Sequence, residues 1–360
     1  RSGGATLPSS NNVTVSSGAT LRVSTNQTLN NLTLPAGASL TVDSGATLTI
    51  NGTFTYSGTI SGAGTIAYGA TGTLIYGLAG TQTTALEWPS ANGPSTVTIN
   101  SGSYTLNSSK SLSGDLILSS GTALTVPSTM NITVGDDLIN SGTVTIQNNA
   151  NLIQNGTTND NVGDVTVFRN SASLFKLDYT LWSSPVASQN LLAFSPSTLP
   201  NRFYTYDSGT DNYSPIVPST NDFLAGVGYL IRMPDDHPTA IATEWNGSFE
   251  GVPNNGNVSV SVTNNTYNAV GNPYPSTIDA DDFINTNGIT EALYFWRKTN
   301  NAATSSYATY TLAGGVGTGS NSGDPLGLVP NGVIQVGQGF IVKSTSTSIN
   351  FDNTMRIGDN

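Results

Sequence analysis

The sequence contains no cysteine and a single histidine, His237. Without cysteine the protein forms no disulfide bond and offers no thiolate for catalysis. With so few nitrogen and sulfur ligands, a zinc site of the usual kind is not expected. A cysteine-free chain that is rich in Ser, Thr and Asn and poor in Lys is typical of repetitive bacterial surface proteins. We therefore expect an extracellular location, on the bacterial outer surface.

Charged residues are also scarce, at 9% of the chain, against roughly 25% in an average soluble protein. The 22 acidic residues outnumber the 11 basic ones, which gives a net charge of −11. Nucleic acids and anionic membranes are bound through basic patches, so neither is an expected partner. No run of about 18 apolar residues occurs, so we expect no transmembrane helix and no membrane insertion.

A duplicated stretch between residues 114 and 146 indicates how the first part of the chain is built. It reads GDLILSSGTALTV and then GDDLINSGTVTI. Gly114 recurs as Gly135, and Gly121 recurs as Gly142, each 21 residues later. A fixed period near 20 residues, with two short strands rich in apolar residues and Thr, is typical of stacked repeats in which each turn covers the next.

The same template recurs as SGATLRV at 17–23, AGASLTV at 36–42 and SGATLTI at 44–50. In each copy Leu, Val or Ile alternates with Thr, Ser or another polar residue, so the apolar side chains point inward and the hydroxyls face water. Glycine supplies the positive φ that the corners require. We therefore predict that residues 1–164 form a β-helix or a similar β-solenoid of six to eight turns.

The period is disturbed between residues 76 and 108, where Glu87, Trp88 and two prolines occur. The simpler interpretation is an inserted loop or an irregular turn. The alternative is a ligand-binding edge formed by Trp88 and Tyr104.

The composition changes after Asn148, and three of the four tryptophans lie beyond residue 164. Short β-branched and aromatic segments separated by Gly, Pro and Asn predict an antiparallel β-sandwich-like domain over residues 165–360. One helix is predicted after Ser276 and Thr277, because these residues can cap it and acidic residues fill its first turn. The predicted strands are 165–170, 176–186, 202–207, 226–233, 242–251, 257–263, 267–274, 291–298, 307–312 and 338–345.

Four segments of this second region occur in a distinctive order: DYTLWSSPV at 178–186, GVGYLIRMP at 226–234, YNAVGNPYPSTIDADDF at 267–283 and GQGFIVKS at 337–344. Together they resemble a module of large secreted and cell-surface proteins of Bacteroidetes-type bacteria, which are often exported by the type IX system. The resemblance covers roughly residues 165–353. It implies a β-rich surface module that follows repetitive stretches, and it carries over no catalytic residues.

Residues capable of catalysis are present without the motifs that would support them. His237 follows Asp236, but no nucleophile motif such as GxSxG occurs, and the segment is predicted to be an exposed turn. Glu244, Glu250 and Glu291 could supply the two carboxylates of a glycosidase, yet all lie in strand-like segments. We expect that the protein is not an enzyme.

Acidic side chains in turns make calcium the one cofactor that we expect, because calcium takes oxygen ligands from carboxylates, amides and carbonyls. The predicted ligands are Asp207, Asp211 and Asp222, which flank the segment DSGTDNYSPIVPSTND. This segment lacks the terminal Glu of an EF-hand loop. Ordinary turn residues are the alternative, as they are for Asp136 and Asp137 on a repeat corner.

Aromatic side chains offer flat apolar faces on which sugar rings could stack. Tyr213, in a polar turn, is the best exposed candidate, and together with Trp88 it is a predicted ligand-binding residue. A wider set has an ordinary core position as its alternative: Trp182, Tyr204, Tyr206, Trp245, Tyr274, Tyr294 and Trp296.

These features predict an extracellular bacterial surface protein with an adhesive or structural role, as part of a stalk or filament. Its expected partners are surface polymers, polysaccharides or other surface proteins. The alternative function is that of a carbohydrate-binding or auxiliary module in a polysaccharide-degrading system.

Overall fold

The computed structural model describes residues 11–297, 307–317 and 328–359. The chain divides into two compact units. The first comprises residues up to Ile146 together with 154–156 and 160–164, and the second comprises 147–153, 157–159 and the chain from Val165 onward. The fold is almost entirely β-structure, with 5% helix, which confirms the predicted fold class.

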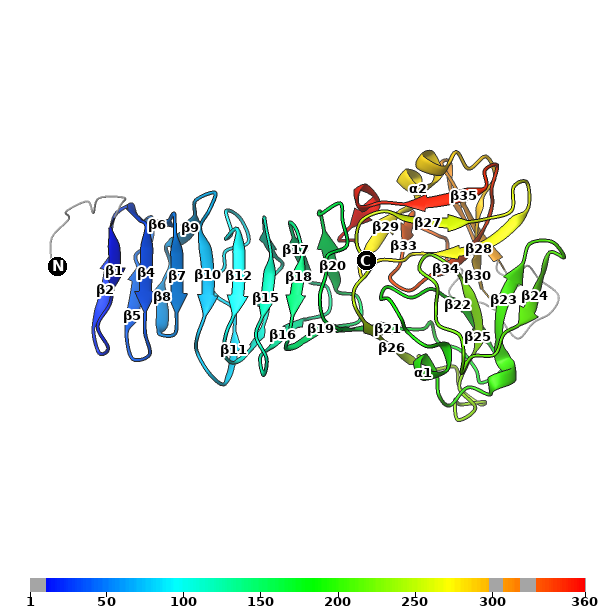
Figure 1. Cartoon of the computed structure of the whole chain (residues 1–360), viewed down its shortest axis with the longest axis horizontal. Coiled ribbons are helices and arrows are strands. Elements are labelled where there is room, and N and C mark those ends of the chain that lie inside the picture. The colour runs from blue at the N-terminus through cyan, green and yellow to red at the C-terminus, as the bar shows by residue number, and fades with distance from the viewer. Residues whose placement is uncertain (1–10, 298–306, 318–327, 360) are drawn as a thin grey trace. The chain divides into compact units, whose positions relative to one another are not determined.

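The first unit is a β-solenoid of about 8 turns, in which strands of successive turns pair in parallel (Figure 1). One face is a seven-stranded sheet. In order across the sheet, its strands are β1 (Asn12–Thr14), β4 (Asn31–Leu34), β7 (Thr53–Tyr56), β10 (Thr73–Tyr76), β12 (Thr96–Ile99), β15 (Leu116–Leu118) and β18 (Leu138–Asn140).

Shorter sheets form the other faces of the solenoid. In the first turns, one such sheet consists of β2 (Thr20–Val23), β5 (Ser39–Val42) and β8 (Thr59–Gly62). A second sheet consists of β3 (Gln27–Leu29), β6 (Thr47–Ile50) and β9 (Thr65–Tyr68). In the later turns they are β11 (Thr81–Thr83), β13 (Ser103–Thr105), β16 (Ala123–Val126) and β19 (Thr143–Ile146), and β14 (Lys110–Leu112) with β17 (Asn131–Val134). Strand β20 (Asn151–Gln154) lies where the division between the two units falls.

The alternation in the sequence sets the inside and outside of the solenoid. Apolar residues at the same register of neighbouring strands are fully buried, as in the series Leu32, Phe54, Leu74 and Val97. Hydroxyls at the outward positions bond to the next turn, with Oγ of Ser39 2.9 Å from Oγ1 of Thr59. Because each turn repeats the same side chain at the same place, the interior stacks into one continuous apolar core.

The glycines that recur in the repeat are required for two physical reasons. Gly121 adopts φ +79°, in the left-handed region that side chains with a Cβ avoid. Gly142, its counterpart 21 residues later, does not; a Cβ there would lie 2.4 Å from the carbonyl oxygen of Thr122. The two glycines of the duplicated stretch are therefore required for different reasons, one conformational and one steric.

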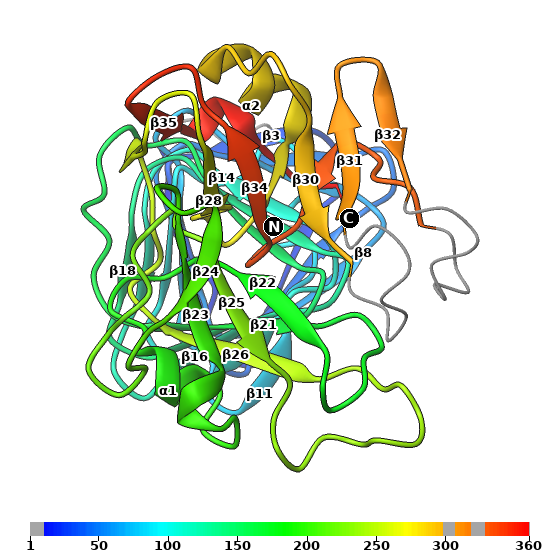
Figure 2. The same ribbon diagram turned by 90° about the vertical axis from the view of Figure 1, so that its right-hand side faces the viewer.

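The second unit consists of antiparallel sheets. Strand β21 (Val165–Asn170) pairs with β26 (Asn246–Gly251), and β27 (Val258–Ser261) pairs with β35 (Ser348–Phe351). A four-stranded sheet has the order β22 (Tyr179–Trp182), β25 (Tyr229–Arg232), β23 (Phe203–Asp207) and β24 (Asn212–Pro215). A five-stranded sheet has the order β28 (Tyr267–Gly271), β34 (Gly339–Lys343), β30 (Leu293–Trp296), β31 (Tyr307–Thr311) and β32 (Gly314–Val316) (Figure 2). A short sheet has the order β33 (Val333–Ile334), β29 (Thr277–Asp279) and β36 (Arg356–Ile357).

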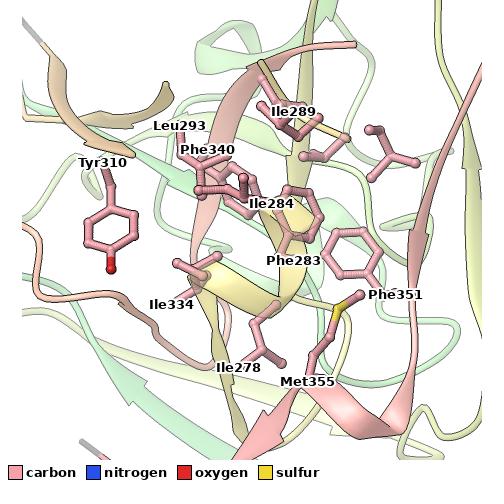
Figure 3. Close-up of a cluster of buried hydrophobic side chains, with 14 of the residues drawn as sticks. Ile278, Phe283, Ile284, Ile289, Leu293, Tyr310, Ile334, Phe340, Phe351 and Met355 are labelled. Carbon is pink, nitrogen blue, oxygen red and sulfur yellow. The ribbon is translucent and has the colours of Figure 1, made fainter. Parts of the chain in front are cut away.

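In the described part of this unit, the α-helices are α1 (Leu191–Phe194) and α2 (Ala280–Asn287). The predicted helix is present as α2, but Ser276 and Thr277 do not cap it. Thr277 is in strand β29, so the helix begins later and the Asp279 carboxylate accepts hydrogen bonds from the second and third helical N–H groups. The inward face of α2 packs Phe283 against Phe340 and Phe351, with ring centroids 5.1 Å apart in both pairs (Figure 3).

The motif GNPYPS, which carries much of the family-like resemblance, forms a buried turn. The Asn272 side chain is inaccessible to solvent; its amide donates to the Ser276 carbonyl (2.7 Å) and its oxygen accepts from the Tyr274 N–H (3.0 Å). The Tyr274 hydroxyl donates to the Gly256 carbonyl (2.6 Å). These contacts make the motif a structural element rather than a ligand site.

The turn packs against the buried guanidinium of Arg356 through Ser276 and Tyr274. Within the part of the chain that the structure describes, the hydrogen-bond acceptors of this guanidinium are carbonyl, hydroxyl and amide oxygens and include no carboxylate. Its nitrogens donate to Ser276 Oγ (3.0 Å), Asn255 Oδ1 (2.9 Å) and the Leu152 carbonyl (2.6 Å). The guanidinium also lies over the Tyr274 ring, 4.7 Å from its centroid. Burial lowers the pKa of Arg356 to about 9, so the group stays charged at neutral pH.

We predict that Arg356→Met lowers the free energy of unfolding of the second unit by at least about 3 kcal/mol, because it leaves several buried polar groups without partners. Denaturant unfolding followed by tryptophan fluorescence measures the change. The control is Lys343→Gln, which removes a partly exposed pair with Glu291 (2.8 Å) and is expected to cost no more than about 1 kcal/mol. Equal effects of the two substitutions would contradict the role of Arg356.

Candidate functional site

Trp88, a predicted ligand-binding residue, is not at an exposed edge. Its indole is fully buried inside the solenoid, and its Nε1 donates to the Ser111 carbonyl (3.1 Å). Tyr104, its proposed partner, is also buried, with its ring centroid 4.2 Å from that of Tyr76. The aromatic side chains of this irregular stretch therefore point inward and fill the solenoid. This arrangement agrees with the simpler interpretation, an irregular turn, and not with an exposed ligand-binding edge.

Glu87 is buried in the same place. Its Oε1 accepts hydrogen bonds from the Tyr76 hydroxyl (3.0 Å) and the Ala85 N–H (2.7 Å), whereas its buried Oε2 accepts none from the described residues. The Lys110 ammonium donates to the Trp88 carbonyl nearby. Burial raises the pKa of Glu87, and the hydrogen bonds and the charge of Lys110 oppose this only in part.

Tyr213 is in strand β24 and not in an exposed turn. Its ring packs edge-to-face against Tyr206 (5.2 Å between centroids) and Trp296 (6.2 Å), and its hydroxyl lies 3.1 Å from that of Tyr307. Burial raises the pKa of Tyr213. The structure gathers several predicted aromatic residues around Leu181, Leu230 and Ile341 in this layer, which contains Tyr204, Tyr206, Tyr213, Tyr294 and Trp296. Each of these five side chains is partly buried and packs against the three aliphatic residues, so Tyr213 is not the well-exposed turn residue that the sequence predicted.

The predicted calcium ligands are not brought together as one group. Asp207 accepts from the Gly209 N–H (2.9 Å), which lowers its pKa. Asp211 accepts from the Tyr206 hydroxyl. Asp222 accepts from the Asn190 amide (3.1 Å) and so helps to hold the residue that caps α1. Each carboxylate serves its own turn, a local role that the sequence spacing does not distinguish from metal binding.

Among the described residues, one group of three carboxylates does lie within 4.8 Å, and it consists of Asp115, Asp136 and Asp137. These residues occupy one corner of successive solenoid turns, and the Asp137 N–H donates to Asp115 (3.3 Å). Burial, followed by the charges of Asp136, Asp160 and Asp115, raises the pKa of Asp137. The sequence pointed to Asp136 and Asp137, but Asp115 joins them only through the stacking of turns.

The second unit contains a cleft of about 490 Å³ beside Trp245, which we name the Trp245 cleft. Its volume falls within the range of about 300–1,000 Å³ usual for small-molecule sites. The cleft is lined by Gln189, Ala193, Phe194, Ser195, Pro196, Ser197, Pro234, Asp236, Trp245, Asn246, Ser248 and Glu250.

Strand β26 supplies one wall of the cleft. Asn246, Ser248 and Glu250 alternate with buried residues along the strand, so their side chains point to the same side. The glycine between the first two allows close packing, because a Cβ on Gly247 would lie 2.8 Å from the Arg169 carbonyl and 3.2 Å from Trp245 Cζ3. The Trp245 ring is partly exposed and meets Phe194 edge-to-face, with centroids 5.2 Å apart.

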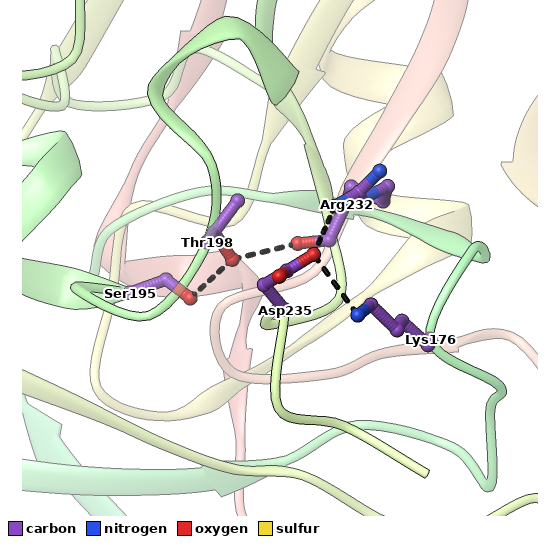
Figure 4. Close-up of polar contacts among 5 residues, drawn as sticks. All are labelled: Lys176, Ser195, Thr198, Arg232 and Asp235. Carbon is purple, nitrogen blue, oxygen red and sulfur yellow. Dashed lines mark hydrogen bonds and ion pairs between the residues drawn. The ribbon is translucent and has the colours of Figure 1, made fainter. Parts of the chain in front are cut away.

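The opposite wall is held by a polar network. Thr198 bonds to Ser195 (2.8 Å) and donates to the Arg232 carbonyl (2.9 Å), and Asp235 pairs with both Arg232 and Lys176 at 3.1 Å (Figure 4). The Asp235 N–H also donates to the Ser197 carbonyl (2.8 Å). These contacts fix the 195–198 segment relative to the 234–236 turn.

His237 supports this turn from within. It is 7% exposed, and its Nε2 lies 2.8 Å from the Leu174 carbonyl. The expected exposed turn therefore has a buried imidazole at its end, and His237 does not line the cleft. Gln189 lies at the base of the cleft, where its Oε1 accepts from the Glu250 N–H (2.7 Å).

Sequence reasoning named Trp245 and Glu250 separately, one as an aromatic candidate and the other as a possible acid. It did not connect them with each other or with Asp236, which it considered only as the neighbour of His237, and it did not identify Gln189 or Ser197. The alternation of polar residues in 246–250 was the available signal. No local pattern places this strand opposite the 195–198 segment, which is about 50 residues earlier in the chain.

Residues 83–360 match a family model described as a domain of unknown function (DUF8693). The chain belongs to this family. The DUF8693 match begins at the last residue of β11, so it includes later turns of the solenoid as well as the second unit with its cleft. No curated protein and no solved structure matches the chain. In the described part of this DUF8693 member, no helix has the length and apolar character needed to cross a membrane.

We predict that the stability of the solenoid falls as the pH rises above about 4.5 through the raised pKa of Glu87. Folding then favours the protonated carboxyl, so the contribution is fully present below the unfolded pKa and is lost above the folded one. Glu87→Gln removes this titration. Thermal unfolding of both proteins between pH 4 and 8 measures the difference, and parallel stability curves would contradict a desolvated Glu87.

We also predict that Asp137→Asn raises the melting temperature of the solenoid in buffer containing EDTA, by relieving repulsion worth about 0.5 kcal/mol. Thermal unfolding at low salt and at 1 M NaCl measures this, and the gain is expected to shrink with salt. A destabilised variant would contradict the prediction. A parallel series with added calcium tests the ion expected from the sequence: a rise seen in wild type and absent from Asp137→Asn would assign an ion to this corner.

Proposed function

We propose that this chain is a non-catalytic, adhesive protein of the bacterial outer surface that binds polysaccharide through its second unit. The Trp245 cleft is the observation that carries the proposal. It combines a partly exposed indole with hydroxyl, amide and carboxylate side chains, which is the mixture of groups that suits a ligand with apolar ring faces and many hydroxyls.

The solenoid suits a structural role beside this binding role. Its outward positions are mostly uncharged, and its turns are tied to one another by hydroxyl pairs such as Thr41 with Ser61 (3.0 Å). Such a unit supplies a regular, stable body without chemistry of its own. Export by a type IX route and a Bacteroidetes-type source are part of the proposal, and they are supported by the resemblance of the second region alone.

Binding without turnover is proposed because of the setting of the two carboxylates in the cleft. The general acid of a glycosidase usually lies in an apolar surrounding. The side chains of Asp236 and Glu250 are both exposed to water. This setting favours hydrogen bonding to a ligand over proton donation to a leaving group.

The second candidate function is an auxiliary module that assists a polysaccharide-degrading enzyme, and the same cleft supports it. The two functions differ in what binding achieves. An adhesive protein attaches cells that display it, whereas an auxiliary module raises the activity of an enzyme linked to it on insoluble substrate.

We predict that the purified chain is retained by at least one insoluble polysaccharide and releases no reducing sugar from it. Co-sedimentation with the insoluble polysaccharide and a reducing-end assay measure the two properties. Retention on no polysaccharide would refute the proposed function. Release of reducing ends that is abolished by Glu250→Gln would show an enzyme instead.

A further inference from the structure

We propose that the Trp245 cleft selects neutral sugar residues and rejects acidic ones, with Glu250 and Asp236 as the specificity-determining residues. The proposal rests on the proposed function, because it names the ligand class of the same site. It is argued from the charges of the cleft and from the packing of its aromatic ring.

The charge of the cleft is negative. Among the described residues that line it, two are carboxylates and none is a cation. Two basic residues beside the 234–236 turn, Arg232 and Lys176, each pair with Asp235 at 3.1 Å, and none of these three residues lines the cleft. The charges of Asp236 and Glu250 are therefore not neutralised by these two cations.

This arrangement treats neutral and acidic sugars differently. A carboxylate accepts hydrogen bonds from sugar hydroxyls, and such charge-assisted bonds are stronger than neutral ones. The carboxylate of a uronic acid or a sulfate ester would instead meet like charges, which is an effective way to reject a competing ligand. Asn246 and Ser248, on the same side of β26 as Glu250, offer uncharged donors and acceptors to either ligand.

The aromatic ring points to a sugar rather than to an organic cation. Cation recognition in a cage uses several ring faces directed at one ligand. The rings beside Trp245 do not form such a cage. Phe194 and Trp182 are both buried and pack edge-to-face against Trp245, with ring centroids 5.2 and 5.9 Å from its own. One ring held rigidly in this way is suited to stacking against a sugar ring, and its rigidity lowers the entropic cost of binding.

The test uses the full chain and two sets of soluble probes. The neutral set contains cello-, xylo-, manno- and malto-oligosaccharides, and the acidic set contains oligogalacturonate and alginate oligomers. Isothermal titration calorimetry gives the affinities. We expect binding to at least one neutral probe, and at least tenfold weaker binding to every acidic probe.

Four variants assign the selectivity to residues of the cleft. Glu250→Gln is expected to lower the affinity for the neutral probe about tenfold, because a hydrogen bond to a charged group is lost. The double variant Asp236→Asn/Glu250→Gln is expected to reduce the difference in affinity between neutral and acidic probes. Trp245→Phe is expected to retain most of the affinity but to lose the fluorescence change on binding. The matched control is Glu244→Gln, an exposed carboxylate that bonds to Asn170 (3.0 Å) outside the cleft, and it is expected to bind as wild type.

Each outcome bears on a different claim. Tight binding of an acidic probe, or neutral binding that none of the cleft variants changes while their melting temperatures match wild type, overturns the inference but leaves polysaccharide binding intact. Binding to no soluble probe together with no retention on insoluble polysaccharide overturns both. Equal losses in Glu250→Gln and Glu244→Gln would show a general effect of charge and would also overturn the assignment to the cleft.

Discussion

A positive charge buried without a carboxylate partner is the constraint on which the second unit depends. Removing a guanidinium from water costs several kcal/mol unless its donors are satisfied. Arg356 meets this requirement with a carbonyl, a hydroxyl, side-chain amides and the face of Tyr274. Its partners come from residues 152, 255, 276 and 353, so one side chain near the end of the chain ties together four separate segments. The buried GNPYPS turn is shaped to receive it.

The solenoid is stabilised in a different way from the second unit. Its interior is apolar and repetitive, and each turn depends on its neighbours rather than on a central group. The irregular stretch between residues 76 and 108 departs from this rule, because the buried Glu87 carboxylate accepts from the Tyr76 hydroxyl and the Glu87 carbonyl accepts from the Tyr68 hydroxyl. A repetitive core tolerates one such polar insertion when hydrogen bonds from a tyrosine and from the backbone accompany it.

Residue patterns predict the solenoid and the all-β class because both follow from local alternation, which a sequence displays directly. They fail where burial is decided by distant segments. Trp88 and Tyr213 occur in polar stretches that resemble exposed turns, yet Tyr76 and Trp296, respectively, cover them. Asp207 and Asp211 have the composition of a calcium loop but serve their own hairpin. The Trp245 cleft escaped detection because its two walls are distant in sequence, and only the alternation from Asn246 to Glu250 marks one of them.

The parallel register of the solenoid has a consequence for how such a protein changes over evolutionary time. Each turn pairs with the turn before it and offers an equivalent backbone edge to the turn after it. A whole turn of about 20 residues can therefore be duplicated or deleted without disturbing the pairing on either side. Every added turn lengthens the unit by about 4.8 Å, the distance between paired strands. The length of this unit can therefore change by whole turns without altering the residues that line the cleft in the second unit.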